Sequence, residues 1–207
     1  MEILNKSLFW ISTGLLVPTI LGLLYFLGKG LLLLGEFYGV YMNRLKLNKG
    51  LYKTISRLQP EELPGLETKV SNQKSTLFSD SIRRLLETRS SKVQQEKVLT
   101  DFEMASEKDL DRFRTLSKMG PMLGLMGTLI PLGPALASLA AGDISIMAKD
   151  MQLAFNSTVV GLVIGAIGYL LLQTKQRWSL EDLNRLEYIH ELITEASCEE
   201  EEKAHSV

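Results

Sequence analysis

The side-chain hydroxyls of two threonines, each inside a long apolar segment, are the groups in this chain that best suit ion chemistry. Thr128 lies in the segment 119–141 and Thr158 in the segment 151–173. Because a hydroxyl both donates and accepts hydrogen bonds, two of them on facing helices can relay a proton or help to coordinate a small cation. The alternative is that each hydroxyl bonds a carbonyl of its own helix and serves packing alone. Residue type leaves both interpretations open.

Side chains for other kinds of chemistry are scarce. The 207 residues include one cysteine, Cys198, and two histidines, His190 and His205. An intrachain disulfide is therefore excluded, and no nucleophile–base pair or cluster of metal ligands is visible. We expect a protein that is not an enzyme and has no catalytic residues, no metal and no cofactor. The basic excess of residues 43–118 is explained by membrane topology, so no nucleic-acid partner is expected.

Three apolar segments predict an all-α membrane protein with three transmembrane helices. The two threonine segments each exceed the roughly 20 residues that cross the hydrocarbon core. A third run, LFWISTGLLVPTILGLLYFL, begins at Leu8. It is too long for the apolar region of a signal peptide, so we interpret it as a retained span. Whether this helix ends at Leu27 or continues through Leu34 stays open, because Gly28 and Gly30 weaken a helix without forbidding it.

The basic residues beside the three spans predict how the chain crosses the membrane. Twelve Lys and Arg residues flank one side of the spans, and only Lys6 and Lys149 flank the other. The positive-inside rule then places the N-terminus outside and the C-terminus in the cytoplasm of a multi-pass inner-membrane protein. Residues 142–150 become a short outer turn.

This topology divides the chain into four parts. They are an N-terminal span (1–42), a cytoplasmic helical region (43–118), a transmembrane hairpin (119–173), and a cytoplasmic C-terminal helix with an acidic tail (174–207). Apolar residues recur at helical spacing from Lys92, and no glycine or proline intervenes before Gly120. We therefore predict one extended helix that continues into the second span. The end of the tail, residues 195–207, is too acidic and too poor in apolar residues to become ordered by itself.

Small residues on the two hairpin spans predict close helix packing. Gly120, Gly124 and Thr128 share a face at steps of four residues, and Thr158, Gly161 and Gly165 share one at steps of three and four. Faces of this kind let two helix backbones approach closely. We assign Gly127 the same packing role.

Asn156 and two prolines are the remaining polar or helix-breaking features of the hairpin. Asn156 points about 200° around the helix from Thr158, so we expect it to pack against another helix through an amide hydrogen bond. Pro131 and Pro134 each remove a backbone donor and leave a carbonyl without its helical partner. They predict either a simple kink or a hinge with a carbonyl-lined constriction.

Two stretches of the hairpin resemble a known family. GLMGTLIPLGPAL (124–136) is similar to the second-span motif GLxGTVxG of the MotA/TolQ/ExbB proton-channel family. AFNSTVVGLVIGAIGYLL (154–171) is similar to the third-span pattern of that family, with four residues in register: Ala154, Thr158, Gly161 and Leu162. The first span, the cytoplasmic region and the topology match the family in layout.

The resemblance implies an assembly and a mechanism. Members form a homopentameric ring around two copies of a single-span partner of the ExbD, TolR or MotB type, whose span carries an aspartate. The threonines that match Thr128 and Thr158 line the space beside it, and proton or sodium flow turns one component against the other. We expect a stator-type subunit of an ion-driven motor or energy transducer; the alternative is a passive membrane scaffold.

Two features of the spans bear on that mechanism. Transport-type members carry a glutamate just before the Ala-Leu of the third span, where this chain has Leu153. No acidic residue lies inside the second or third span, and a proton carrier needs an ionisable group at depth. The partner would therefore supply the carboxylate.

Overall fold

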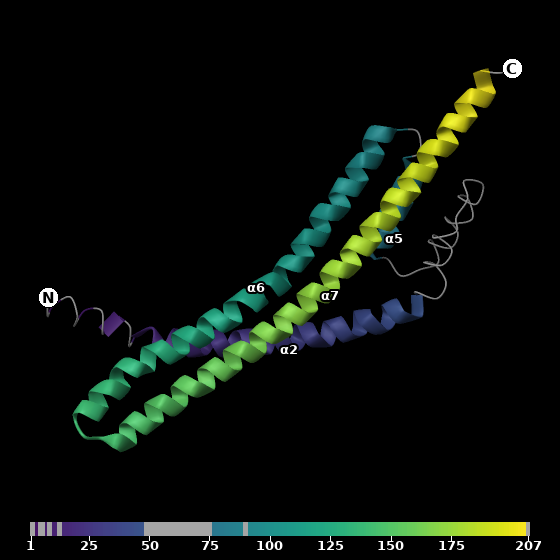
Figure 1. Cartoon of the computed structure of the whole chain (residues 1–207). Coiled ribbons are helices and arrows are strands. Elements are labelled where there is room, and N and C mark those ends of the chain that lie inside the picture. The colour runs from purple at the N-terminus through teal and green to yellow at the C-terminus, as the bar shows by residue number, and fades with distance from the viewer. Residues whose placement is uncertain are drawn as a thin grey trace. The chain divides into compact units, whose positions relative to one another are not determined.

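The computed structural model describes residues 3, 7, 10, 11, 14–47, 76–88 and 91–205, and their regular structure is entirely helical. The helices are α2 (Leu16–Leu47), α5 (Leu77–Glu87), α6 (Lys92–Ala140) and α7 (Ile144–His205) (Figure 1). Three of them, α2, α6 and α7, contain a stretch long and apolar enough to cross a membrane. The predicted all-α membrane fold with three spans is confirmed for these residues.

Helix α2 continues well beyond its apolar stretch. It passes Leu27 and Leu34 without interruption and ends at Leu47. Of the two alternatives that the sequence left open, the helix therefore continues through Leu34. The helix begins at Leu16, after the turn residue Leu15, and Pro18 lies in its first turn. Proline has no N–H to offer to the carbonyl of Gly14, so the helical bond that would continue the ladder is missing there.

Helix α6 is one uninterrupted helix from Lys92 to Ala140, as predicted. It keeps its helical assignment through Pro121, Pro131 and Pro134. A transmembrane helix tolerates prolines because neighbouring helices and hydroxyl side chains can bond the freed carbonyls. The hydroxyl of Ser138 also donates to the carbonyl of Pro134, one turn earlier in the same helix, at 3.0 Å.

The turn between α6 and α7 is shorter than predicted. Helix α7 begins at Ile144, so the outer turn predicted for residues 142–150 is wrong and shrinks to the residues around Gly142. Gly142 has a φ of +81°, which a glycine adopts without strain. Asp143 then caps the new helix, because its carboxylate accepts from the backbone N–H of Ile146 at 3.1 Å.

Helix α7 also extends further than predicted at its other end. It runs to His205, through the acidic stretch 195–207 that was expected to be unordered. The expectation rested on the lack of apolar residues and did not take the high helix propensity of the tail into account. Alanine, glutamate and lysine are among the best helix formers, and they dominate this stretch.

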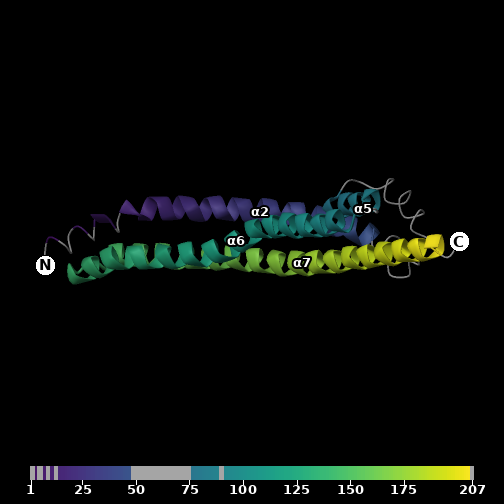
Figure 2. The same cartoon turned by 90° about the horizontal axis from the view of Figure 1, so that it is seen from above.

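The chain separates into two compact units. The first contains Met1–Tyr38 and Asp111–Gln173. Its core joins α2 to the α6–α7 hairpin, and in Figure 2 α2 runs alongside that hairpin. The buried side chains at its centre are Leu23, Leu33, Phe113, Leu116, Ile164 and Leu171.

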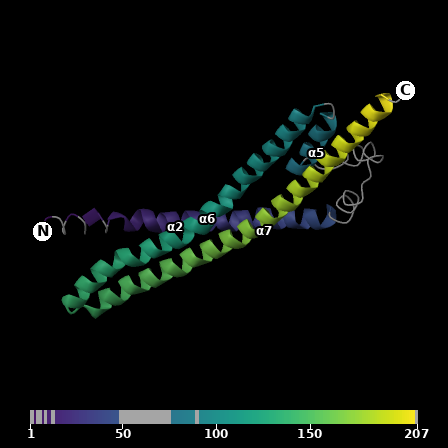
Figure 3. The ribbon, with the colours of Figure 1, turned by 45° about the horizontal axis from the view of Figure 1, so that its top comes forward.

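The second unit contains Gly39–Leu110 and Thr174–Val207. Here α5 packs against the first part of α6 and the last part of α7 (Figure 3). A capping box starts α5: the Thr76 hydroxyl accepts from the Ser79 backbone N–H at 3.2 Å, and the Ser79 hydroxyl accepts from the Thr76 N–H at 2.8 Å. Its apolar core includes Ile82, Leu85, Phe102, Leu186 and Ile189.

The core of the second unit gives a first test. Leu186 is fully buried, so Leu186→Ala should lower the free energy of unfolding by about 2–5 kcal/mol through lost burial and a residual cavity. Leu180 lies on the same helix but is 60% exposed, and Leu180→Ala should have an effect within about 0.5 kcal/mol. Equilibrium unfolding of the purified chain in detergent measures both. Equal losses would contradict this packing.

Candidate functional site

The transmembrane hairpin is held together by direct backbone contact between α6 and α7. A Cβ atom added to Gly161 would lie 2.6 Å from the carbonyl oxygen of Gly120 and 2.6 Å from the Cα atom of Gly124. A Cβ added to Gly120 would lie 2.8 Å from the backbone nitrogen of Gly165. Real Cβ atoms do not come so close to backbone atoms, so only glycine fits at this seam.

The seam extends further from the α6–α7 turn than the sequence analysis recognised. A Cβ on Gly165 would lie 2.6 Å from the ring of Pro121, and one on Gly168 would overlap the backbone of Ser117. Neither Gly168 nor Pro121 was assigned a packing role. The signal was present, because Gly168 follows Gly165 at the same three-residue step that links Thr158 to Gly161.

Toward the α6–α7 turn, the seam ends at Gly127. A Cβ there would lie 2.6 Å from the side-chain oxygen of Ser157. Ser157 is 7% exposed, and its hydroxyl donates to the carbonyl of Ala154 at 2.8 Å. The buried polar position of this seam therefore belongs to Ser157.

Asn156 does not lie in this seam. Its side chain is exposed on the surface of the single chain, so the predicted interhelical hydrogen bond of Asn156 is not made within one chain and stays a prediction for contacts with other chains. The neighbouring serine takes the buried place because it lies about 100° around the helix from Asn156. Leu153, which stands where transport-type relatives of the motif carry glutamate, is 36% exposed.

The two threonine hydroxyls differ in their hydrogen-bond partners. Thr158 donates across the seam to the carbonyl of Gly124 at 3.4 Å. Thr128, one turn beyond Gly124 on α6, donates to the carbonyl of Leu125 in its own helix at 2.7 Å. Both threonines are half-buried, so each still offers part of its surface outside the hairpin. No hydrogen bond joins the two hydroxyls.

The two prolines predicted as a hinge lie near the end of α6 that leads into the turn. Pro131 is buried and Pro134 is half-buried. Lacking N–H groups, they leave the carbonyls of Gly127 and Ile130 without their helical donors. Polar acceptors without a helical partner therefore occur at the same end of the hairpin as Ser157 and Asn156.

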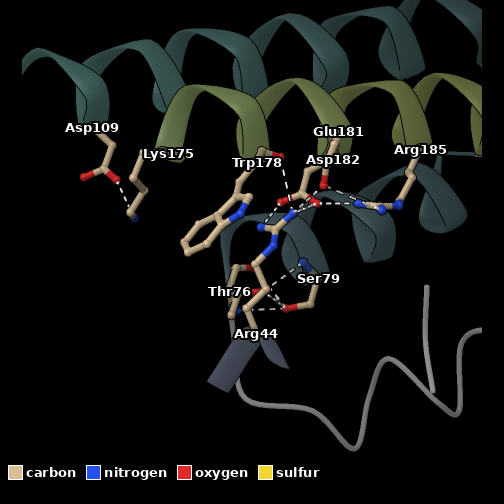
Figure 4. Close-up of polar contacts among 9 residues, drawn as sticks. All are labelled: Arg44, Thr76, Ser79, Asp109, Lys175, Trp178, Glu181, Asp182 and Arg185. Atoms are coloured by element: carbon tan, nitrogen blue, oxygen red, sulfur yellow. Dashed lines mark hydrogen bonds and ion pairs between the residues drawn. The ribbon is translucent and has the colours of Figure 1, made fainter. Parts of the chain in front are cut away.

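A second polar cluster, which the sequence analysis missed, lies in the other unit and is centred on Arg44 (Figure 4). The guanidinium of Arg44, from α2, donates to both carboxylate oxygens of Asp182, from α7, at 2.8 Å each. It also donates to the carbonyl of Trp178 at 3.4 Å and lies 5.0 Å from the centre of the Trp178 ring. The Tyr41 ring stacks on the same indole at 5.9 Å.

The Arg44 cluster is largely removed from water. Asp182 is 7% exposed, and the Arg44 side chain is 17% exposed. Arg185 adds a second guanidinium to Asp182 at 3.0 Å, and Lys175 pairs with Asp109 of α6 at 3.2 Å. A bidentate arginine is directional, so this cluster fixes how α2 and α7 align in the second unit. The sequence signal was the pair Trp178 and Asp182, one turn apart just beyond the third span.

No group of three or more His, Cys, Asp or Glu side chains that could hold a metal ion occurs among the residues that the structure describes. The polar groups of the first unit are instead hydroxyls, amides and backbone carbonyls. Such groups can orient water, pass on a proton or help to coordinate a small cation. None of them carries charge.

The close seam leads to a steric test. Gly161→Ala should lower the free energy of unfolding by about 1–3 kcal/mol, because the new methyl group meets backbone that cannot move aside. Gly28 of α2 has open space around it, so Gly28→Ala should be neutral or stabilise the helix by about 0.5–1 kcal/mol. Thermal unfolding in detergent compares the two. A Gly161→Ala protein as stable as the parent would disprove the contact.

The Arg44 cluster leads to an electrostatic test. Arg44→Ala leaves a buried carboxylate with one arginine fewer and should cost about 3 kcal/mol in unfolding free energy. The Arg177 side chain is 81% exposed and pairs only with Glu181 in the same helix. Arg177→Ala should therefore change stability by less than about 0.5 kcal/mol, measured by the same unfolding experiment. Similar losses for both variants would show that Arg44 acts as an ordinary surface charge.

Comparison with known proteins identifies the hairpin and part of the second unit. The family model for the MotA/TolQ/ExbB proton channel family matches residues 66–188, which include both seam helices and both threonines. Comparison with curated proteins gives no match, and comparison with solved structures gives none. Members of the matched family are channel and transducer proteins of membranes rather than enzymes. The match covers more than half of the chain, and the chain belongs to the MotA/TolQ/ExbB proton channel family.

Proposed function

We propose that this chain is the ring-forming subunit of a proton- or sodium-driven motor or energy transducer of the inner membrane. The observation that carries the proposal is the position of Thr128 and Thr158. Thr158 bonds the carbonyl of Gly124 across the seam, and Thr128 lies one helical turn from Gly124 on α6. Both lie in the part of the chain that the family model matches, and both are only half-buried.

The exposed sides of the two threonines are where a partner would lie. A single-span subunit of the ExbD, TolR or MotB type would bring one aspartate into the membrane beside them. Neither hairpin span of this chain has an acidic residue at depth, so the partner's carboxylate would be the titrating group. The two hydroxyls would then hand the ion or proton to and from that carboxylate.

The proposed assembly is a homopentameric ring around the partner, with the N-terminus outside and the C-terminus in the cytoplasm. The excess of basic residues on one side of the spans supports this orientation. A charge that crosses a potential of 100 mV releases about 2.3 kcal/mol. That energy is enough to shift a packed helix between two positions.

A passive scaffold is the second candidate function. It is favoured by the hydrogen bonds that both threonines already make, Thr128 to Leu125 and Thr158 to Gly124. In a scaffold the two hydroxyls would serve only to form these hydrogen bonds, which stabilise helix packing. The two candidates differ in what happens to ion flow when the hydroxyls are removed.

Replacing both threonines by valine keeps their shape and removes the hydroxyls. In vesicles that contain this chain and its single-span partner, Thr128→Val with Thr158→Val should slow ion flux by about 10- to 100-fold, since a lost hydrogen bond of about 1–3 kcal/mol raises the barrier. Flux is followed with a pH-sensitive or a sodium-sensitive dye inside the vesicles, which also identifies the ion.

Thr19 provides the matched control. It is a buried threonine of the first span whose hydroxyl donates to the carbonyl of Leu15 in its own helix at 2.7 Å. Thr19→Val should leave the flux unchanged. Unchanged flux in the double valine variant as well would rule out the proposed path and favour the scaffold.

A further inference from the structure

One lysine lies within the apolar part of α2 without a charged partner. Lys29 directly follows residues 8–28, none of which is charged. Its side chain is half-buried, and it forms no hydrogen bond or ion pair with any residue that the structure describes. A charge that is partly removed from water is costly unless an opposite charge lies beside it. Lys29 therefore needs an anionic partner that the described part of the chain does not supply.

The contact between α2 and α6 sets the depth of Lys29 in the membrane. A Cβ atom added to Gly30 would lie 3.5 Å from the Cδ2 atom of Leu116, so these two residues are at the same level. Lys118 is two residues further along α6 and is the last charged residue before the apolar segment 119–141. Lys29 and Lys118 are therefore at nearly the same depth, where the hydrocarbon core meets the lipid headgroups.

Lys29 lies on an open flank of α2. Leu23 is buried against the hairpin on the same side of the helix as Gly30. Lys29 is about 100° around the helix from Gly30. Its neighbours on that flank, Tyr25 and Leu32, are both exposed. In a membrane, the surroundings of this flank of the single chain are lipid.

The flank that carries Lys29 borders α6, where it faces a second basic residue. Gly22 is seven residues before Lys29 and so on nearly the same face, and a Cβ added to it would lie 3.4 Å from Leu123 of α6. On α6, Arg112 is exposed one turn from Leu116, on the face that meets α2. The long lysine stem can stay in the apolar region while its ammonium extends toward the level of Arg112. Two cations therefore border one groove between the helices.

A lipid headgroup suits this pair better than the carboxylate of a protein partner. In the proposed function the partner's aspartate lies beside Thr158, which bonds Gly124. On α2 that level is marked by Gly22, which meets Leu123, and Lys29 is about 10 Å further along the axis. The phosphates of a bilayer, in contrast, lie at the boundary itself, and basic residues beside a span attract anionic headgroups. A zwitterionic headgroup brings its own cation, so a net anionic lipid is favoured.

We propose that Lys29 and Arg112 form a binding site for the headgroup of an anionic phospholipid. The phosphate accepts hydrogen bonds from both side chains, and the acyl chains lie along the exposed side chains of Tyr25 and Met122 just inside the boundary. This inference needs only a chain that lies in a membrane, so it is independent of ion conduction and of the assembly.

Native mass spectrometry of the delipidated full chain in mild detergent measures this binding directly. The parent chain should bind phosphatidylglycerol about tenfold more tightly than phosphatidylcholine. Lys29→Met keeps an apolar stem and removes the ammonium. It should weaken phosphatidylglycerol binding by about tenfold or more, because a charge-assisted hydrogen bond is lost. Arg112→Gln should also weaken it, and Lys29→Arg should retain most of it.

Lys118→Met is the control matched for depth and charge. Lys118 is exposed, but it lies about 160° around α6 from Leu116, away from the groove. Its loss should change phosphatidylglycerol binding by less than about twofold. Inorganic phosphate should not displace the lipid, because it lacks the acyl chains that add to the affinity. Helix content by circular dichroism establishes that each variant folds.

Thermal unfolding in lipid nanodiscs gives an independent measurement of the same site. Phosphatidylglycerol in place of phosphatidylcholine should raise the unfolding temperature of the parent chain, since a ligand that binds the folded state stabilises it. The same exchange should have a smaller effect on Lys29→Met than on Lys118→Met.

Four results would each overturn the inference. They are equal affinity of the parent chain for the two lipids, unchanged binding by Lys29→Met, equal losses for Lys29→Met and Lys118→Met, and displacement of the lipid by inorganic phosphate. Equal losses would show a diffuse attraction of surface charge, and displacement would show a site for free phosphate.

Discussion

Backbone-to-backbone contact between α6 and α7 is the constraint on which the rest of the membrane unit depends. Gly120 and Gly124 meet Gly161 and Gly165 with no room for a side chain. Lipid gives helices little hydrophobic reason to associate, so close packing and polar contacts must hold the hairpin together. Because the backbones touch, the hydroxyl of Thr158 can reach the carbonyl of Gly124 across the seam.

The same contact determines which polar side chains of the hairpin are buried and which are exposed. Ser157 is enclosed at the end of the seam nearest the α6–α7 turn, the two threonines remain half-buried, and Asn156 is exposed on another face. We propose that the enclosed serine serves packing within a chain and that the half-buried threonines line a path for ions. In the second unit, where water is available, the Arg44 cluster uses charge in place of close backbone contact to align α2 with α7.

Much of this architecture could be predicted from residue types. The three spans follow from apolar length, and the single helix α6 follows from the absence of glycine and proline before Gly120. The glycines at steps of three and four residues likewise pointed to a face where backbones meet. These signals are local and periodic, and the membrane allows few alternatives to a helix.

Features that depend on tertiary contacts could not be predicted in this way. Residue types could not tell whether Asn156 or Ser157 takes the buried place, because the two lie next to each other and only the rotation of the helix decides. The Arg44–Asp182 pair joins residues 138 positions apart in the sequence. The periodicity of side chains along one helix cannot predict a contact between residues so far apart. For the acidic tail the prediction failed for a local reason. Helix propensity outweighed the lack of apolar residues, so the helix continues to His205.

The central claim is that Thr128 and Thr158 line a path that water and ions can enter, and cysteine accessibility tests it most directly. Single cysteines at positions 128 and 158, in a Cys198→Ser chain, are exposed to a small water-soluble thiol reagent in native membranes. The account predicts that both react, and much faster than a cysteine at Val163, which is 47% exposed and lies about 140° around α7 from Thr158. Cysteines at 128 and 158 that react no faster than the one at 163 would contradict it.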